Sequence, residues 1–219
     1  NCMKKKVIVI VSIGLILGVG IRIYYINKTA RKPVYEYYAL DEWVDYNGSY
    51  QIGANENTKG YYARVLDATF MTYKEYVEKY GFSLDTLPNM YKDSLSKEKV
   101  EDIYNLGMID VQIEYRNVSS IDGHMALSES KIFALEDNIY YGICEPLLDL
   151  QIPELAGGMG YFFSLKPNGE SVILNVPYAL PIYSDGEFGK ETGNFPKYLT
   201  ITQNPVRKFV EIPVKNERR

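Results

Sequence analysis

The sequence is poor in the residues that build disulfide scaffolds and histidine-based sites. Its 219 residues include two cysteines, one histidine and one tryptophan. Two cysteines cannot form a disulfide-rich framework. Because His124 is the only imidazole, a histidine-based metal centre or a Ser-His-Asp triad is hard to assemble. We therefore expect a protein without a metal ion and without a cofactor.

Sequence motifs of the large enzyme classes are also missing. The chain contains no GxSxG, HExxH, paired CxxC, P-loop or dinucleotide-binding pattern. Pairs of acidic residues do occur, at Glu42 and Asp45 and at Glu136 and Asp137, and two carboxyl groups can hydrolyse a glycosidic bond. A small hydrolase of the cell envelope stays open as an alternative, but we expect the protein not to be an enzyme.

Acidic residues are absent from the first 32 positions, which carry seven lysines and arginines. All 28 acidic side chains follow, with the other 17 basic ones, so the remainder of the chain has a net charge of −11. Proteins that bind nucleic acid need a basic surface to contact phosphates. We therefore expect no nucleic-acid partner.

The basic residues flank the one long apolar run of the chain, Val7 to Ile26. A membrane-spanning helix needs about 20 residues, so this run is long enough if Arg22 extends to the membrane surface. Three lysines at positions 4–6 precede it, as basic residues precede the apolar core of an export signal. We predict a single-pass signal-anchor over residues 1–26, with the C-terminal domain outside the cell. Secretion after cleavage of a signal peptide is the alternative.

Beyond the predicted membrane segment the only cysteine is Cys144, so the exported body cannot contain an internal disulfide. Secreted eukaryotic domains commonly contain disulfides, and their absence favours a bacterial protein. In the apolar run that ends in Ile143 and Cys144, we interpret the thiol as a packed, inert side chain. The exported part is predicted to comprise a tether with a tyrosine-rich loop region over residues 27–59 and a globular domain over residues 60–219.

Two helices are predicted from capping signals and helical spacing. Thr72 and Glu75 fit a capping box that starts the first helix, and Gly81 is suited to end it. The second helix is expected over Ser96–Leu106. Between them, Ser83–Leu95 contains a proline and is expected to be a loop.

Alternation of apolar and polar residues predicts strands elsewhere. The clearest case is Met108–Val118, where Ile109, Val111, Ile113 and Tyr115 alternate with polar residues. Over Tyr62–Phe70 the even-numbered residues are expected to face the core. Further strands are expected over residues 131–135, 139–144, 161–165, 171–180, 198–203 and 206–214. We predict a mainly β protein, an antiparallel immunoglobulin-like β-sandwich with one or two short inserted helices, preceded by a single N-terminal transmembrane helix.

A family resemblance rests on three segments in a fixed order. The strand over residues 108–118 ends in Tyr-Arg-Asn-Val, residues 165–171 form the turn Leu-Lys-Pro-Asn-Gly-Glu-Ser before a core strand, and residues 199–202 read Leu-Thr-Ile-Thr. This order resembles the membrane-anchored or lipid-anchored immunoglobulin-like domains of unknown function that low-GC Gram-positive bacteria export. The resemblance implies a sandwich fold and an exterior location, and it supplies no catalytic residues.

Tyrosine is unusually frequent, with 21 residues, and ten of these lie between Tyr35 and Tyr80. Exposed aromatic rings anchor interfaces because they bury a large area at low entropic cost. The candidate binding surface consists of Tyr35, Tyr37, Trp43 and Tyr46. Its partner is expected to be an envelope protein or a cell-wall polymer. Two alternatives stay open, namely tyrosines that fill the core and an accessory subunit of a membrane export or immunity complex.

Overall fold

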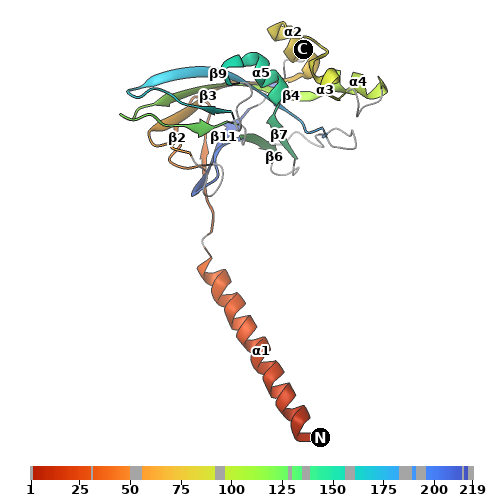
Figure 1. Cartoon of the computed structure of the whole chain (residues 1–219), viewed down its shortest axis with the longest axis vertical. Coiled ribbons are helices and arrows are strands. Elements are labelled where there is room, and N and C mark those ends of the chain that lie inside the picture. The colour runs from red at the N-terminus through yellow and green to blue at the C-terminus, as the bar shows by residue number, and fades with distance from the viewer. Residues whose placement is uncertain are drawn as a thin grey trace. The chain divides into compact units, whose positions relative to one another are not determined.

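The computed structural model describes residues 2–30, 32–49, 56–91, 97–127, 130–134, 139–155, 161–182, 189–190, 196–213 and 215–216. The chain forms two compact units, Asn1–Pro33 and Val34–Arg219 (Figure 1). The second unit therefore begins at Val34 and includes most of the region that was predicted to be a tether.

The first unit consists of one helix, α1 (Cys2–Thr29), whose apolar residues lie on all sides rather than along one stripe. The unit has no other element to cover them, and Leu15, Ile16 and Ile21 are 66%, 71% and 69% exposed. Across the described part of the chain, no helix is long and apolar enough to cross a membrane. The predicted span Val7–Ile26 lies within α1, but its side chains up to position 11 are outside the described residues.

The second unit, which we call the body, is built on a ten-stranded sheet. The order of its strands is β1-β11-β10-β6-β7-β9-β4-β3-β12, and β2 also pairs with β3. Neighbours are antiparallel except for β1 with β11 and β12 with β3. A small second sheet pairs β5 with β8. The strands are β1 (Val34–Tyr38), β2 (Val44–Asp45), β3 (Tyr61–Thr72), β4 (Gly107–Asn117), β5 (Met125–Ala126), β6 (Lys131–Ala134), β7 (Ile139–Ile143), β8 (Phe162–Phe163), β9 (Glu170–Ala179), β10 (Lys197–Thr202), β11 (Val206–Ile212) and β12 (Lys215–Asn216).

The prediction of a mainly β protein is confirmed, but the described strands do not divide into the two large facing sheets of the predicted sandwich. Instead the long sheet curls until its two ends approach each other. Lys208 on β11 forms an ion pair with Asp45 on β2, and its ammonium group also donates to the Asp45 carbonyl oxygen at 2.8 Å. A bridge between Ser49 and Asn204 joins the same two regions.

The three longest strands, β3, β4 and β9, lie side by side in one half of the sheet and contribute many residues to the apolar core. In β4 the side chains of Val111, Ile113 and Tyr115 are buried, as the alternation of the sequence predicts. In β3 the predicted parity is wrong, because Tyr61, Ala63 and Val65 are buried and the even-numbered neighbours are less so.

The predicted parity fails in the first half of β3, because the parity changes within the strand. The register between β3 and β4 shifts between Val65 and Asp67, which marks a β-bulge. A bulge adds one residue to a strand and moves every later side chain to the other face. Ala68 is consequently buried, although it shares its parity with the more exposed Tyr62 and Leu66.

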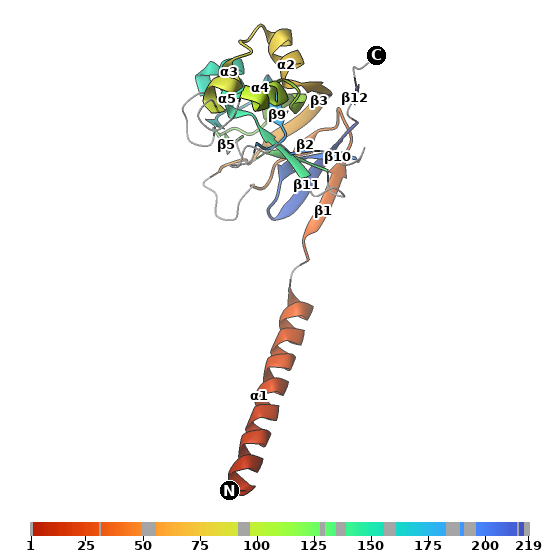
Figure 2. The same ribbon diagram turned by 90° about the vertical axis from the view of Figure 1, so that its right-hand side faces the viewer.

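The four short helices α2 to α5 gather at one end of the body, as the two views in Figures 1 and 2 agree. In α2 the predicted capping box of Thr72 and Glu75 is confirmed, and Gly81 ends the helix with φ of 70°. The predicted loop Ser83–Leu95 is wrong in part, because it contains α3. Pro88 is compatible with α3 because it lies in the first turn, where its missing N–H would have no helical acceptor. The helices are α2 (Tyr73–Tyr80), α3 (Thr86–Tyr91), α4 (Lys97–Tyr104), α5 (Glu145–Gln151) and the 3-10 turn Pro153–Leu155.

Candidate binding surface

The first strand of the body lies at one end of the sheet. β1 pairs in parallel with β11, so that Tyr35 is opposite Arg207 and Tyr37 is opposite Phe209. Because side chains alternate along a strand, Tyr35 and Tyr37 share one face of β1. Glu36 and Tyr38 lie on its other face.

Tyr35 and Tyr37 belong to a continuous group of aromatic rings in stacked and edge-to-face contacts. The Tyr37 ring centroid is 5.7 Å from that of Phe209 and 5.5 Å from that of Tyr198, and the Tyr35 centroid is 6.3 Å from that of Phe209. Phe209 is buried, whereas Tyr35 and Tyr37 are 45% and 55% exposed. The Arg207 guanidinium group lies 5.6 Å from the Tyr35 ring centroid. We call these five side chains the β1 aromatic surface.

The other face of β1 is acidic. The Tyr38 hydroxyl donates to Glu36 Oε2 at 2.7 Å. The pKa of Tyr38 is raised well above its usual value, first by burial, then by the hydrogen bond to Glu36 and by the negative charges of Glu36, Asp45 and Glu42. Lys208 is the register partner of Glu36, but its ammonium group binds Asp45. This face of β1 therefore has a negative electrostatic environment.

Trp43 does not join the β1 aromatic surface. Its half-buried ring packs against two guanidinium groups, with the Arg116 group 3.9 Å and the Arg64 group 4.6 Å from the ring centroid. Arg64 in turn pairs with Glu114 at 2.5 Å and with Asp41 at 3.2 Å. These contacts attach the segment between β1 and β2 to the outer side of β3 and β4. The arrangement is suited to holding that segment in place.

Tyr46, the fourth residue of the predicted surface, is a core residue. Its side chain is 1% exposed and its ring centroid lies 6.4 Å from that of Tyr115. The structure thus brings together two of the four predicted residues, Tyr35 and Tyr37. It places Trp43 in a cation–π contact and Tyr46 in the core.

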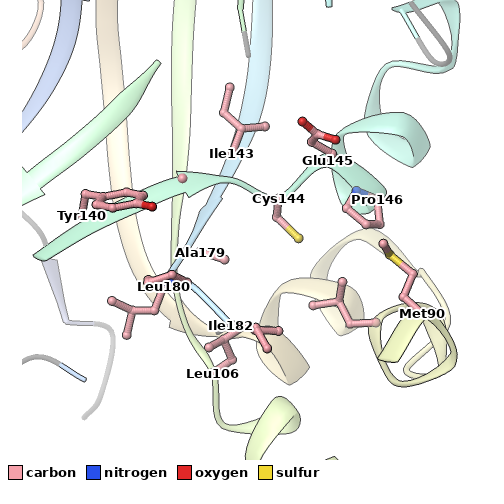
Figure 3. A pocket seen from close by; sticks show the side chains of 13 residues that line it. Met90, Leu106, Tyr140, Ile143, Cys144, Glu145, Pro146, Ala179, Leu180 and Ile182 are labelled. Atoms are coloured by element: carbon pink, nitrogen blue, oxygen red, sulfur yellow. The ribbon is translucent and has the colours of Figure 1, made fainter. Parts of the chain in front are cut away.

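An apolar hollow of about 310 Å³ lies between α3, α5 and the end of β9. Figure 3 shows the Cys144 thiol directed into this hollow, with Met90, Leu106 and Ile182 around it. Burial raises the pKa of the Cys144 thiol to about 12. A protonated thiol is a poor nucleophile, so this hollow is suited to packing or to holding an apolar group rather than to thiol catalysis.

Of the paired acids of the hydrolase alternative, Glu42 and Asp45 do not line the hollow between α3, α5 and β9. Asp45 binds Lys208, and Glu42 Oε2 accepts a hydrogen bond from the Ala39 backbone at 3.1 Å. The second pair, at positions 136 and 137, lies outside the described residues. Among the side chains that the structure describes, no three metal-binding groups lie together.

Comparison with known protein families identifies the domain that the body contains. One family model, described as a domain of unknown function (DUF5028), matches residues 35–208. The chain belongs to the DUF5028 family. No curated protein and no solved structure matches it. The description of the family mentions neither the immunoglobulin-like fold nor the membrane anchor that the sequence resemblance implied.

The DUF5028 domain begins and ends in the two strands that pair at this surface. Its match starts at Tyr35 in β1 and finishes at Lys208 in β11. The β1 strand is thus part of the DUF5028 domain, and α1 lies outside it. Four of the five residues of the surface, all except Phe209, lie within the matched range.

Sequence reasoning missed Phe209, Tyr198 and Arg207, which complete the surface. Each lies in a strand that the alternation of the sequence does predict. What the alternation cannot supply is the pairing of β1 with β11, because about 170 residues separate the two strands in the DUF5028 chain.

Proposed function

We propose that this protein is a membrane-tethered interaction domain that binds a protein partner outside the cytoplasm through the β1 aromatic surface. The observation that carries the proposal is the exposure of Tyr35 and Tyr37 above a buried Phe209. Large aromatic rings that are exposed but already packed against one another supply binding area. They lose little further side-chain entropy when a partner covers them.

The stacking makes the surface ready for binding. The Tyr37 ring is held from two sides by Phe209 and Tyr198, and Arg207 Nη1 lies 3.3 Å from the Tyr35 hydroxyl oxygen. Side chains that are ordered before binding lose less entropy when the partner arrives. Such residues are common at the centres of protein interfaces.

The tether is proposed from the sequence of the first unit. The run Val7–Ile26 has the length of a membrane span, and α1 is apolar on all sides. Lysines at positions 4–6 favour a cytoplasmic N-terminus. In the sequence, four residues, 30–33, separate α1 from β1.

The binding role is tested by photo-crosslinking in native membranes. A photo-reactive residue replaces Val34, which is 55% exposed and precedes Tyr35 in β1, and the control is placed at Ile121, which is 48% exposed. We expect a discrete cross-linked protein from position 34 and none from position 121. Combined replacement Tyr35→Ser and Tyr37→Ser should lower the yield at least about tenfold.

A matched tyrosine variant separates binding from a general loss of tyrosine. Tyr140→Ser removes a tyrosine that is 40% exposed on β7, and its cross-linking yield should equal that of the unaltered chain. If the yield from position 34 does not depend on Tyr35 and Tyr37, the proposed surface is wrong. Cross-links to wall polymer instead of protein would also contradict a protein partner.

Membrane orientation has a separate test. Protease added to intact cells without their wall should digest the body and spare cytoplasmic markers. Full protection of the body until the cells are lysed would contradict the proposed location outside the cytoplasm.

A further inference from the structure

The outer edge of β1 is open. β1 is the last strand in the order of the sheet, and no described residue pairs with the edge opposite β11. A free edge presents backbone N–H and C=O groups in the spacing that another strand needs. The other end of the sheet, β12, has only two residues, so β1 is the longer edge available for pairing.

The sequence of β1 contains one charged residue, Glu36, and otherwise has little that would discourage edge pairing. Its five residues are Val-Tyr-Glu-Tyr-Tyr, without the proline, lysine or glycine that usually discourages edge pairing. Valine and tyrosine are among the residues that favour strands. The described register between β1 and β11 also runs without a bulge. The strand is therefore well suited to accept a further strand.

Charge decides what kind of strand fits. Glu36, Glu42 and Asp45 all act on the Tyr38 hydroxyl, and the one described lysine beside them, Lys208, is bound to Asp45. A second copy of β1 paired symmetrically about Glu36 would place two glutamates opposite each other, which is unfavourable. A strand with a lysine or arginine opposite Glu36 would gain a favourable cross-strand pair.

We propose that β1 binds an extended segment of a partner protein by strand addition, with a basic residue opposite Glu36. The segment continues the sheet beyond β1, and its side chains on the other face contact Tyr35 and Tyr37. Backbone hydrogen bonds supply affinity in this mode, and side chains supply selectivity. The inference rests on the proposed function, because it concerns the same surface.

The test uses a synthetic peptide and the full chain in lipid nanodiscs. The peptide is Thr-Val-Thr-Lys-Thr-Val-Thr with blocked ends and a fluorescent label, and a second peptide has Glu in place of the Lys. Anisotropy should give about fivefold tighter binding for the Lys peptide. Methylation of the interior amide nitrogens on both edges should abolish binding, because strand addition needs those donors.

Hydrogen exchange supplies the structural readout. The β1 amides that point away from β11 exchange quickly in the free chain and should become protected when the Lys peptide is added. Glu36→Gln keeps an acceptor for the Tyr38 hydroxyl but removes the charge, so the preference for the Lys peptide should disappear. The matched control is Glu101→Gln, an exposed position on α4, which should keep the fivefold preference.

Three outcomes would overturn the inference. These are equal binding of the methylated peptide, peptide binding without protection of β1 amides, and self-association of the chain through β1 in sedimentation experiments. If neither peptide binds while cross-linking from position 34 still depends on Tyr35 and Tyr37, strand addition is wrong and the proposed function stands. If neither peptide binds and cross-linking from position 34 does not depend on Tyr35 and Tyr37, both the inference and the proposed function are wrong.

Discussion

Cys144 shows how packing determines what a reactive residue can do. It precedes α5, is 8% exposed and directs its thiol into the apolar hollow of Figure 3. Desolvation is the largest cause of its raised pKa, and the neighbouring Glu145 charge adds to it. The thiolate is therefore scarce at every pH below about 12.

We expect iodoacetamide to modify Cys144 at least about 100-fold more slowly in the folded chain than in urea. The reason is that folding removes both the access and the thiolate that the reaction needs. Mass spectrometry of the peptide that contains Cys144 measures both rates. Similar rates in the two states would show that the thiol is accessible and ionised.

Asp110 is a second residue whose surroundings matter more than its type. Its carboxylate is 6% exposed on β4, where Oδ2 accepts hydrogen bonds from the Lys79 ammonium group at 2.8 Å and from the Tyr80 hydroxyl at 2.7 Å. The interaction ties α2 to the sheet. We interpret it as a structural ion pair, because it joins a side chain of α2 to a buried carboxylate of β4.

At the scale of elements, α2 depends on its first turn. Thr72 Oγ1 accepts from the Glu75 backbone N–H at 3.2 Å, and Glu75 Oε2 accepts from the Thr72 backbone N–H at 2.6 Å. Thr72→Ala removes one of these bonds and should lower the free energy of unfolding by about 1 kcal/mol. Urea unfolding measures the change.

The control for the capping prediction is Lys74→Ala, at an exposed position of the same helix. It should change the free energy of unfolding by less than about 0.5 kcal/mol. Equal effects of the two substitutions would mean that the capping box is not what stabilises α2.

The elements also show which structure can be predicted from sequence. The start and end of α2 follow from Thr72, Glu75 and Gly81, which lie within ten residues of one another. The strand β4 follows equally from its own alternation. Local signals of this kind predict that a helix or strand forms, but they do not predict which other elements it pairs with or packs against.

The failures have non-local causes. The burial pattern of β3 depends on a bulge against β4, and the place of β1 depends on pairing with β11, far along the chain. When that pairing is not known, the sequence of Val34–Tyr38 is interpreted as part of a tether. For the same reason Tyr35 and Tyr46 look alike in the sequence, although one is exposed and the other is buried.

At the scale of the whole molecule, the tyrosine-rich core predicts sensitivity to alkali. Burial is the largest cause that raises the pKa values of Tyr73 and Tyr76 above the ordinary value of 10. Above that pH these residues ionise in the unfolded chain but stay protonated in the folded one. Stability is therefore complete below pH 10 and is lost as the pH rises further.

We expect the free energy of unfolding to fall above pH 10 by about 1.4 kcal/mol per pH unit for each such tyrosine. Urea titrations from pH 8 to pH 11.5 measure this slope, and tyrosinate absorbance should rise together with the loss of structure. Stability that is constant over this range would contradict the buried state of these hydroxyls.

The body is expected to fold without α1. Its buried apolar core lies entirely between Val44 and Ile212, and Cys144 has no disulfide partner. A chain that begins at Lys32 should be soluble, give a β-type circular dichroism spectrum and melt cooperatively under reducing conditions. A mainly helical spectrum or a non-cooperative transition would contradict the prediction.

The contact of Trp43 with Arg64 and Arg116 gives the chain a built-in optical signal. Trp43 is the only tryptophan, so indole fluorescence comes from one place, where the segment after β1 meets β3 and β4. Release of that segment would expose the indole to water and to a dissolved quencher while the rest of the sheet kept its far-ultraviolet spectrum. Local opening near the β1 edge can thus be followed separately from global unfolding, without adding a dye.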